Sequence, residues 1–250
     1  MNNIYISIVS HNHDEMIINN IYNEKIAAME NVIFIIKDNV SSKILSDFCI
    51  VNNILYIDKP LYVGFGENNN VVFDYAINNG MEDSDWFAVI NPDVIITDVA
   101  VENLLSSLSS EKNELLTINL YQDLEKGIFD NSLRKFPTWK SFFNLFLGKP
   151  ANVAYDKIKL SDKDKVDWAA GSFLIFKASL YKKLKGFSNK YFMYYEDVDI
   201  CYRAKKNHNQ SVSFLKNIKA VHIGAYANRK IFSKHFRWYL KSFLTFLLNK

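Results

Sequence analysis

The sequence predicts an α/β protein with a mostly parallel sheet flanked by helices. Its 250 residues are enough to bury one large core, and its hydrophobic and charged fractions, 49% and 23%, are those of ordinary globular proteins. In the first third of the chain, short apolar runs alternate with polar, helix-like segments. These runs are Ile4–Val9, Val32–Ile36, Ile54–Ile57 and Trp86–Ile90. Apolar runs of this kind, about 20 to 30 residues apart, are typical of buried parallel strands joined by crossover helices.

The later part of the chain is less regular. Residues 101–108 have the pattern of a helix, and residues 115–121 that of a strand. Residues 134–150 are expected to form a mobile excursion with exposed aromatic side chains, and the run Val166–Phe176 a turn followed by a strand. Because no internal repeat, low-complexity tract or Gly/Ser linker divides the chain, we expect one domain over residues 1–230.

The remaining residues, 231–250, have the pattern of a basic amphipathic helix. Aromatic side chains such as Phe236 and Phe243 recur at helical spacing, and Lys234 and Lys241 fall on the other face. Such a helix is expected where a segment lies in a membrane interface, although a terminal helix docked on its own domain has the same pattern. The charges interrupt the apolar run, which excludes a membrane span for this segment.

Charge is distributed unevenly along the chain. The net charge is +3, but residues 201–250 contain eleven Lys or Arg and no Asp or Glu, so residues 1–200 carry a net charge of −8. A basic end of this kind favours a polyanionic partner, either an anionic membrane surface or nucleic acid. No nucleic-acid recognition motif accompanies it, so we expect a lipid surface and no nucleic acid.

The composition and the N-terminal residues predict a cytoplasmic protein. Cys49 and Cys201 lie far apart in the sequence and have no CxxC partners, which is typical of reduced thiols in a cytosolic setting. The first apolar run, Ile4–Val9, is too short for a membrane span, and the residues before it lack the charged start of a signal peptide.

Polar residues follow each predicted strand of the first third. Ligands of open α/β sheets bind at the carboxyl ends of the strands, so these residues form a candidate binding rim. They are Ser10-His11-Asn12, Lys37-Asp38-Asn39, Gly64 to Asn70, and Asn91-Pro92-Asp93. The segment Gly64-Phe65-Gly66 lacks the third glycine of a dinucleotide fingerprint. Its glycines still allow a close backbone approach, and the asparagines after it supply neutral hydrogen-bonding groups.

Two strand ends carry residues suited to a metal and a diphosphate. Pro92 fixes a turn that leaves Asp93 pointing out of the sheet, where Mg²⁺ could be shared by a carboxylate and phosphate oxygens. An Asx turn without a ligand is the alternative. His222 ends the apolar run 218–221, where it could coordinate a metal or donate to a phosphate, and Arg229 suits diphosphate recognition. A lone histidine is more often structural.

The segment Tyr191–Arg203 holds three carboxylates behind a block of aromatic and apolar side chains. Glu196, Asp197 and Asp199 would be costly to desolvate there unless a cation, a metal or a proton shares the site. Enzymes use such an arrangement to hold a general base at a chosen pKa. Acidic residues also favour the first turn of a helix, so a helix start is the alternative.

In this order and spacing, the segments resemble the family 2 glycosyltransferases, inverting enzymes with the Rossmann-like GT-A fold that use nucleotide-diphosphate sugars. The resemblance covers residues 4–227 and is most specific in Val166–Phe176 and Tyr191–Arg203. Within the family, these two segments together with Arg134–Pro137 and Phe232–Lys241 are similar above all to bacterial O-antigen rhamnosyltransferases. The resemblance therefore implies the GT-A fold.

The resemblance also implies a role for each rim residue. Asp197 matches the catalytic base. Asp93 matches the last residue of the family's D-x-D motif, which binds the Mg²⁺ or Mn²⁺ ion that bridges the diphosphate, with His222 as a further metal-site residue. Asn91 replaces the first Asp of this motif, so the metal site carries less charge. Donor binding falls to Ser10 and Asp38 at the nucleoside, Gly66, Asn69 and Asn70 along the nucleotide, Trp168 by the donor sugar, and Asn91 and Arg229 near the diphosphate.

The same resemblance implies substrates and a cellular location. We expect transfer of L-rhamnose from dTDP-L-rhamnose to a GlcNAc-diphosphate-undecaprenol acceptor in O-antigen or polysaccharide assembly, with the enzyme peripheral on the cytoplasmic face of the inner membrane. Galactofuranose or another deoxyhexose is the alternative donor sugar, and a non-catalytic nucleotide-sugar-binding scaffold is the alternative function. A nucleotidyltransferase is disfavoured, because such enzymes usually carry a Gly-rich basic loop where this chain has residues 10–13.

Overall fold

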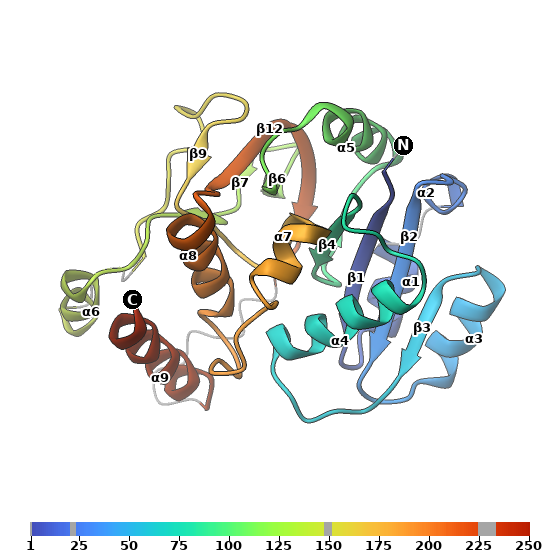
Figure 1. The fold of residues 1–250 in the computed structure, drawn as a ribbon, viewed down its shortest axis with the longest axis horizontal. Coiled ribbons are helices and arrows are strands. Elements are labelled where there is room, and N and C mark those ends of the chain that lie inside the picture. The colour runs from blue at the N-terminus through green and yellow to red at the C-terminus, as the bar shows by residue number, and fades with distance from the viewer. Residues whose placement is uncertain (1, 21–23, 148–151, 225–233) are drawn as a thin grey trace.

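A mixed sheet of ten strands forms the centre of the computed structural model, which describes residues 2–20, 24–147, 152–224 and 234–250 (Figure 1). The strands of this sheet are β1 (Ile4–Ser10), β2 (Val32–Asp38), β3 (Leu55–Asp58), β4 (Trp86–Ile90), β5 (Val94–Ile95), β6 (Leu115–Asp123), β7 (Ile128–Phe129), β9 (Lys165–Val166), β11 (Phe173–Lys177) and β12 (Val212–His222). Their order is β3-β2-β1-β4-β11-β6-β12-β5, with β7 beside β6 and β9 beside β12.

The four strands predicted in the first third of the chain are confirmed and are parallel. β1 pairs with both β2 and β4, and β2 pairs with β3. Their carboxyl ends therefore lie at one edge of the sheet, where the polar residues of the predicted rim follow them. β11 runs antiparallel between β4 and β6, and β12 is parallel to β6. The result is a mainly parallel sheet with the antiparallel strand β11 in its middle, and the short strands β5, β7 and β9 also pair antiparallel with β12 or β6.

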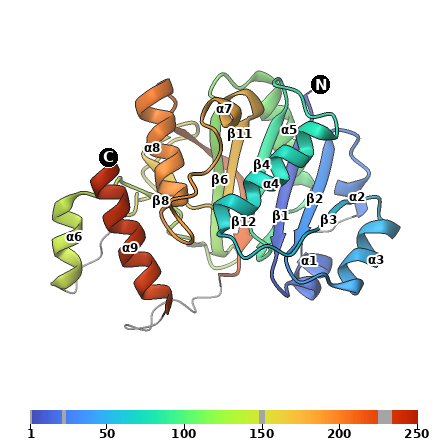
Figure 2. The ribbon, with the colours of Figure 1, turned by 60° about the horizontal axis from the view of Figure 1, so that its bottom comes forward.

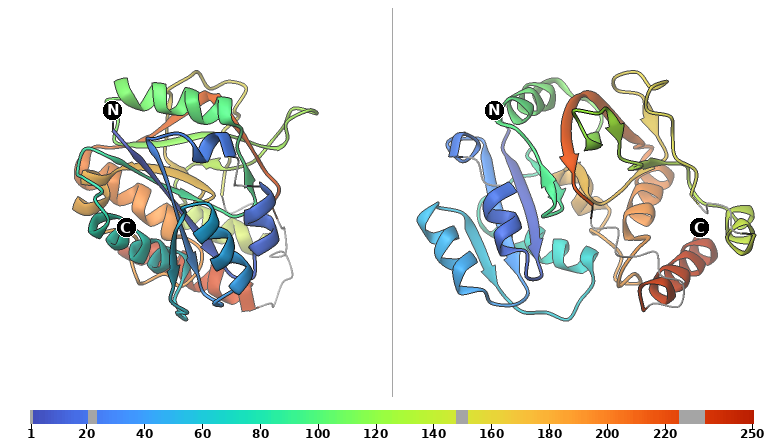
Figure 3. Two further views of the ribbon diagram at one scale, coloured as in Figure 1. Left: turned by 90° about the vertical axis from the view of Figure 1, so that its right-hand side faces the viewer. Right: turned by 180° about the vertical axis from the view of Figure 1, so that it is seen from behind.

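Helices cover both faces of the sheet. One face packs against α4 (Phe65–Asn78), α7 (Ala178–Lys183) and α8 (Glu196–His208), and the other against α1 (Asp14–Asn20), α2 (Glu24–Ala27), α3 (Lys43–Val51) and α5 (Asp98–Ser110). A separate two-stranded sheet consists of β8 (Leu133–Arg134) and β10 (Trp168–Ala169). The helices α6 (Trp139–Phe146) and α9 (Lys234–Asn249) lie at the end of the molecule opposite α3 (Figures 2 and 3).

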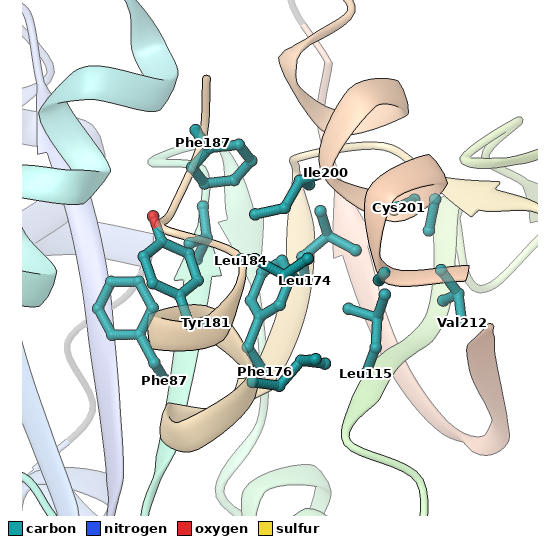
Figure 4. Close-up of a cluster of buried hydrophobic side chains, with 14 of the residues drawn as sticks. Phe87, Leu115, Leu174, Phe176, Tyr181, Leu184, Phe187, Ile200, Cys201 and Val212 are labelled. Atoms are coloured by element: carbon teal, nitrogen blue, oxygen red, sulfur yellow. The ribbon is translucent and has the colours of Figure 1, made fainter. Parts of the chain in front are cut away.

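Alternate residues of the central strands enter two hydrophobic cores, one on each face. In β4, Phe87 belongs to the core beneath α4, α7 and α8, whereas Ala88 belongs to the core on the other face. Figure 4 shows the first of these cores, in which Tyr181 contacts Phe87 and Phe176 edge to face, with ring centroids 4.9 and 5.1 Å away. Burial stabilises the fold by about 1.5–3 kcal/mol for each large apolar side chain.

The described part of residues 134–150, the predicted mobile excursion, contains the helix α6. Thr138 and Ser141 form a capping box that satisfies backbone N–H groups at the start of the helix. Phe142 packs on Phe243 of α9, with ring centroids 5.5 Å apart. A local cap and a long-range contact thus stabilise a helix that the apolar pattern alone did not reveal. The exposed aromatic side chains predicted for this segment are present on the outer side of α6.

The C-terminal helix α9 packs its apolar face on the rest of the protein. Phe243, Phe246 and Leu247 are buried, and the Phe243 ring stacks on Tyr195 with centroids 5.0 Å apart. The structure therefore favours a helix docked on its own domain, the alternative to a helix whose aromatic face lies in lipid. Across the described residues, no helix is long and apolar enough to cross a membrane. Attachment to a membrane surface stays a prediction.

Candidate active site

Asp197 lies at the start of α8, which the chain enters through two residues in the left-handed backbone region. Tyr194 and Tyr195 have φ values of 68° and 67°, uncommon for aromatic residues and costly unless the surroundings hold them. Asp197 Oδ2 accepts a hydrogen bond from Gly171 N at 3.0 Å, and Oδ1 accepts one from Val198 N at 2.8 Å. These bonds fix the orientation of a partly exposed carboxylate.

The electrostatics around Asp197 suit a general base. Burial raises the pKa of Asp197 above its usual range, while the N–H groups of Gly171 and Val198 and the charge of Arg134 oppose the rise. Its neighbour Glu196 is buried, and Glu196 Oε2 has no partner among the described residues. Burial, and then the charge of Asp197, raises the pKa of Glu196 well above its usual range. Glu196 is therefore harder to ionise than an exposed glutamate, because burial and the neighbouring charge both oppose its negative form.

Asp199 belongs to an ion pair that fastens α8. Its Oδ2 accepts from Arg203 Nε at 2.7 Å. Arg203 also donates to Leu184 O at 2.6 Å and to Gly186 O at 2.9 Å, so the pair ties the helix to the segment between α7 and α8. Both interpretations of the acidic run therefore apply, each to a different residue. Asp197 has the geometry of a general base, and Asp199 has a structural role in the first turns of the helix.

The two-stranded sheet of β8 and β10 forms a wall beside Asp197. Trp168 is buried, and its Nε1 donates to a backbone carbonyl 2.9 Å away. Arg134 Cζ lies 5.6 Å from the centroid of the Trp168 ring, and its charge acts on Asp197. A side chain at Gly171 would approach the ring of Phe65 to 2.9 Å, so a larger residue in the turn after β10 would displace that ring. The structure thus brings Trp168 and Arg134 to the candidate base.

The predicted metal-site residues Asp93 and His222 face each other. β5 pairs with the end of β12, which aligns the two side chains. His222 Nε2 lies 3.3 Å from Asp93 Oδ1, and His222 Nδ1 lies 3.0 Å from Asp130 Oδ2. Asn91 anchors the same turn, because its N–H donates to Ser172 O at 3.1 Å. The turn after β4 is therefore joined both to His222 and to the wall that carries Gly171.

His222 carries a proton on both ring nitrogens in this arrangement. Burial alone would lower the pKa of His222, but hydrogen bonds with Asp130 and Asp93 and their charges outweigh burial and raise the pKa to about 9. A divalent cation could take the place of the Nε2 proton beside Asp93, while Asp130 would hold the other nitrogen, as carboxylates do for metal-bound histidines.

The donor set fits a divalent cation that is bound together with a diphosphate. Asp93 and His222 supply one carboxylate and one imidazole, a set that Mg²⁺ or Mn²⁺ accepts. Among the described residues, no three side chains surround a single point suited to an ion. Phosphate oxygens and water would therefore complete the coordination shell.

Ser10 and Asp38 are buried at the ends of β1 and β2, and both side chains have partners inside the protein. Ser10 Oγ accepts from His13 N at 3.2 Å. Asp38 accepts from two backbone N–H groups of the loop after β2 at 2.7 and 2.9 Å, and from Tyr56 Oη at 2.9 Å. These bonds shape the two loops of the rim. A direct contact of either residue with a nucleoside stays a prediction.

Two neighbouring side chains of the predicted rim, His11 and Asn39, are placed to contact a ligand. Asn39 Nδ2 and His11 Nε2 lie 3.0 Å apart on the exposed rim. Lys37 is buried beneath them and donates to Asn39 Oδ1 and to Lys59 O. Burial is the main cause that lowers the pKa of Lys37 to about 8. The signal in the sequence was a lysine directly after the apolar run of β2.

Gly66, Asn69 and Asn70 serve the packing of α4. A side chain at Gly66 would approach Phe187 Cβ to 2.6 Å. Asn69 is buried and accepts from a serine hydroxyl of β1 at 2.6 Å. Asn70 Oδ1 accepts from Phe187 N at 2.9 Å and from Tyr181 Oη at 2.7 Å, and its Nδ2 donates to Phe187 O at 2.9 Å. These bonds give the asparagines a place in the scaffold, and their contact with a donor stays a prediction.

Three further residues bear on the site: one predicted residue that lies outside the described part of the chain, and two to which no role was predicted. Arg229, predicted near the diphosphate, lies outside the described residues. Asp130 was missed, because it is 92 residues away from His222 and no local pattern marks it. Arg134 lies in one of the segments on which the family resemblance rests, but no role at the site was predicted for it. Its position over Trp168 depends on the pairing of two very short strands, β8 and β10.

Comparison with known proteins identifies the family. The chain is 32% identical over 249 residues to rhamnosyltransferase WbbL of Escherichia coli K12. The aligned residues cover 99% of this chain and 93% of WbbL. The chain belongs to the family 2 glycosyltransferases. It is also 25% identical over 222 residues to the low-salt glycan biosynthesis hexosyltransferase Agl10 of Haloferax volcanii, covering 89% of this chain and 67% of Agl10. The sequence matches no family model.

A further relative and two solved structures extend this finding. The glycosyltransferase is 28% identical over 173 residues to the N-acetylglucosaminyl-diphospho-decaprenol L-rhamnosyltransferase of Mycobacterium tuberculosis, covering 66% of this chain and 56% of that protein. The mannosyltransferase PcManGT of Pyrobaculum calidifontis, in complex with GDP-Man and Mn²⁺, has a TM-score of 0.60 at 11% identity, covering 90% of this chain and 58% of PcManGT. TarS 1–349 of S. aureus, in complex with UDP, has a TM-score of 0.56 at 13% identity, covering 88% and 60%. The glycosyltransferase spans about three fifths of these solved chains, and they confirm its GT-A fold.

The variant Asn70→Ala tests the scaffold role of that side chain. It should lower the free energy of unfolding of the glycosyltransferase by about 2–4 kcal/mol, because buried groups of Phe187 and Tyr181 lose their partners. Denaturant unfolding followed by circular dichroism measures the change. The matched control is Asn79→Ala at the end of α4, whose exposed side chain donates to Tyr75 O, with an expected loss below about 1 kcal/mol. Unchanged stability with weakened nucleotide binding would instead make Asn70 a donor contact.

The pH dependence of stability tests the ion pairs of His222. Its folded pKa of about 9 lies above the ordinary value of 6.5, so the stabilisation is fully present below pH 6.5 and is lost as the pH rises through 9. The expected loss is about 3 kcal/mol. Urea unfolding in the presence of EDTA, at several values from about pH 6 to pH 10, measures it in the wild type and in His222→Gln. Parallel pH profiles of the two proteins would contradict the assignment.

Proposed function

We propose that this enzyme is an inverting glycosyltransferase that moves L-rhamnose from dTDP-L-rhamnose to a GlcNAc-diphosphate-undecaprenol acceptor in O-antigen or related polysaccharide assembly. The similarity to WbbL, a rhamnosyltransferase, along nearly the whole chain supports the donor sugar. The Mycobacterium tuberculosis relative, whose name gives an N-acetylglucosaminyl-diphospho-decaprenol acceptor, supports the acceptor class. The partly exposed carboxylate of Asp197, oriented by two N–H groups at the wall of the site, is the observation that carries the reaction type.

Asp197 is the general base in this proposal. It takes the proton from an acceptor hydroxyl while that oxygen attacks the anomeric carbon of the donor. The bond to the nucleoside diphosphate breaks on the opposite face, so the configuration inverts. Because burial raises the pKa of Asp197 and Gly171 N fixes one of its oxygens, the carboxylate is a stronger base and is already oriented for proton transfer.

The other end of the site is suited to the leaving diphosphate. Asp93 and His222 would hold a divalent cation, which when bound supplies positive charge to the departing diphosphate. Asp130 fixes the ring of His222 through Nδ1. Arg134 supplies a further positive charge beside Trp168, and we assign Arg229 to the diphosphate because arginine matches phosphate geometry.

We place the reaction at the cytoplasmic face of the inner membrane. A polyprenyl-linked acceptor is anchored in lipid by its hydrocarbon chain, and its diphosphate and sugar lie at the surface. The enzyme then needs to reach the surface and not to cross the bilayer. No helix of the described residues is long and apolar enough to cross one.

The variant Asp197→Asn tests the base. The amide keeps the shape of the side chain but cannot take a proton, so turnover should fall by about 10²–10⁴ while donor binding is retained. Product formation and calorimetric binding of dTDP measure the two quantities. The matched control is Asp156→Asn, an exposed carboxylate with 51% of its side chain accessible, which should keep wild-type activity. Retention of most activity in Asp197→Asn would assign the base to another residue.

The donor and acceptor are tested together on the purified wild-type enzyme. It is incubated with Mg²⁺ and a GlcNAc-diphosphate-lipid, and dTDP-L-rhamnose, UDP-galactofuranose and UDP-GlcNAc are offered separately. Mass spectrometry of the lipid should show a deoxyhexose increment with dTDP-L-rhamnose alone. An increment with another donor would keep the reaction type and replace the sugar. The absence of product with every donor, together with the absence of nucleotide binding, would favour the scaffold function.

A further inference from the structure

The helix α6 carries a stripe of apolar side chains that faces away from the protein. Trp139, Phe143 and Leu147 recur every four residues, so they lie on one side of the helix and its last turn. Their exposed fractions are 46%, 62% and 70%. On the inner side, Phe142 and Leu145 pack against the core. Trp139 and Phe143 contact the ring of Phe142 edge to face within the same helix, and the outer side of the stripe stays exposed.

The helix α9 does not offer a comparable surface. Its aromatic side chains Phe243 and Phe246 are buried against Tyr195 and Tyr202, with ring centroids 5.0 and 5.6 Å apart. Lipid contact through this face would require the helix to leave the segment that holds Asp197. The buried face of α9 is therefore closed to lipid while the helix stays docked, and the exposed aromatic stripe at this end of the molecule is that of α6.

Charge at this end of the molecule favours an anionic partner. The helices α6 and α9 contain Lys140, Lys234, Arg237 and Lys241 and no Asp or Glu, and Lys250 follows α9. In the sequence, residues 134–150 and 201–250 together contain 15 of the 30 Lys and Arg residues and none of the 27 Asp and Glu residues, so the other residues carry a net charge of −12. Basic helices on a protein whose remainder is acidic favour contact with a polyanion.

A basic hollow of about 270 Å³ lies between α8 and α9. Lys190, Lys206 and Lys250 line it, and all three are exposed. The carboxylate in its lining, Asp199, is already paired with Arg203. The hollow therefore offers unneutralised ammonium groups to anionic headgroups.

The hollow and the apolar stripe border each other. Lys250 Nζ donates to Pro137 O at 3.3 Å, two residues before Trp139. Lys140, exposed on α6 itself, places a further cation next to the stripe. Figure 2 shows α6 and α9 together at this end, away from α3. Aromatic and aliphatic anchors beside lysines are the combination that binds the interface of an anionic bilayer.

We propose that the outer stripe of α6 inserts into the surface of an anionic lipid bilayer while the lysines around it contact the headgroups. The biological reason for this contact rests on the proposed function, because a lipid-linked acceptor must be reached at the bilayer. Arg134, beside Trp168 in the active site, is five residues before Trp139, a reach of at most about 17 Å along the chain. The inserted stripe would therefore hold the wall of the active site close to the headgroup layer.

The test measures binding of the full-length protein to vesicles by flotation, without donor or acceptor. Vesicles of phosphatidylethanolamine, phosphatidylglycerol and cardiolipin should bind the wild type at least tenfold better than vesicles of pure phosphatidylcholine. The triple variant Trp139→Ser, Phe143→Ser and Leu147→Ser should lose at least tenfold in partition into the anionic vesicles. Equal binding to both kinds of vesicle, or an unchanged partition of the triple variant, would overturn the proposal.

The matched control removes equally exposed apolar side chains at the opposite end of the molecule. Ile44, Ile50 and Val51 of α3 are 68%, 72% and 78% exposed, and their replacement by serine should leave vesicle binding unchanged. An equal loss in this control would overturn the assignment to α6. In addition, vesicles should shift the tryptophan emission of the wild type to the blue, and Trp139→Phe should bind equally well with this shift largely lost. A shift that persists in Trp139→Phe would also contradict insertion of α6.

Activity separates this proposal from the proposed function. With a short-chain, water-soluble GlcNAc-diphosphate acceptor, the triple variant should keep wild-type turnover, whereas with a long-chain acceptor in vesicles it should lose tenfold or more. If the wild type forms no rhamnosyl product with either acceptor, the proposed function fails, and the vesicle measurements still decide the role of α6. Equal losses on both acceptors would show a damaged site and would overturn the proposal.

Discussion

The close approach of α4 to the segment before α8 is the constraint on which the site depends. A side chain at Gly64 would come within 1.9 Å of Phe192 O, and Phe65 N donates to that same oxygen at 3.2 Å. The segment so held continues through Tyr195, in the left-handed region, directly into Asp197. The orientation of the candidate base is therefore set by a backbone contact that only glycine allows, and the local strain is offset by packing that comes from α4 and α9.

The sequence predicts the sheet because four short, continuous apolar runs are typical of strands that are buried on both faces. It predicts a candidate base because three acidic residues beside a block of aromatic side chains are unusual. It does not predict α6, whose stability depends on a cap and on contact with α9. It also misses Asp130, which meets His222 only after 92 residues of chain have folded. Asn69 and Asn70 were predicted as donor contacts, and the structure shows in addition that their amides bond to the protein itself. Local chemistry does not show which way a polar side chain points.

His222 shows how one arrangement can serve both a proton and a metal. Between Asp93 and Asp130 the ring is held by a carboxylate at each nitrogen, and the pKa of His222 is raised to about 9. The same geometry places one nitrogen beside Asp93, where a cation would compete with the second proton. The doubly protonated ring would offset one of the two negative charges, whereas a divalent cation beside the neutral ring would offset both. Asn91, neutral where the family has an acid, avoids a third charge that would need a partner.

The helices α6 and α9 have similar compositions but use their aromatic side chains differently. Both α6 and α9 combine aromatics with lysines and lack acids, so either could lie at a membrane. Packing decides between them: α9 uses its rings to stack on Tyr195 and so supports the segment that leads to Asp197, whereas α6 keeps Trp139 and Phe143 outside. If α9 left its docked position for lipid, it would remove the support of the segment that leads to the candidate base. In the proposed contact with a bilayer, the apolar side chains therefore come from α6, and the basic residues of both helices would face the anionic surface.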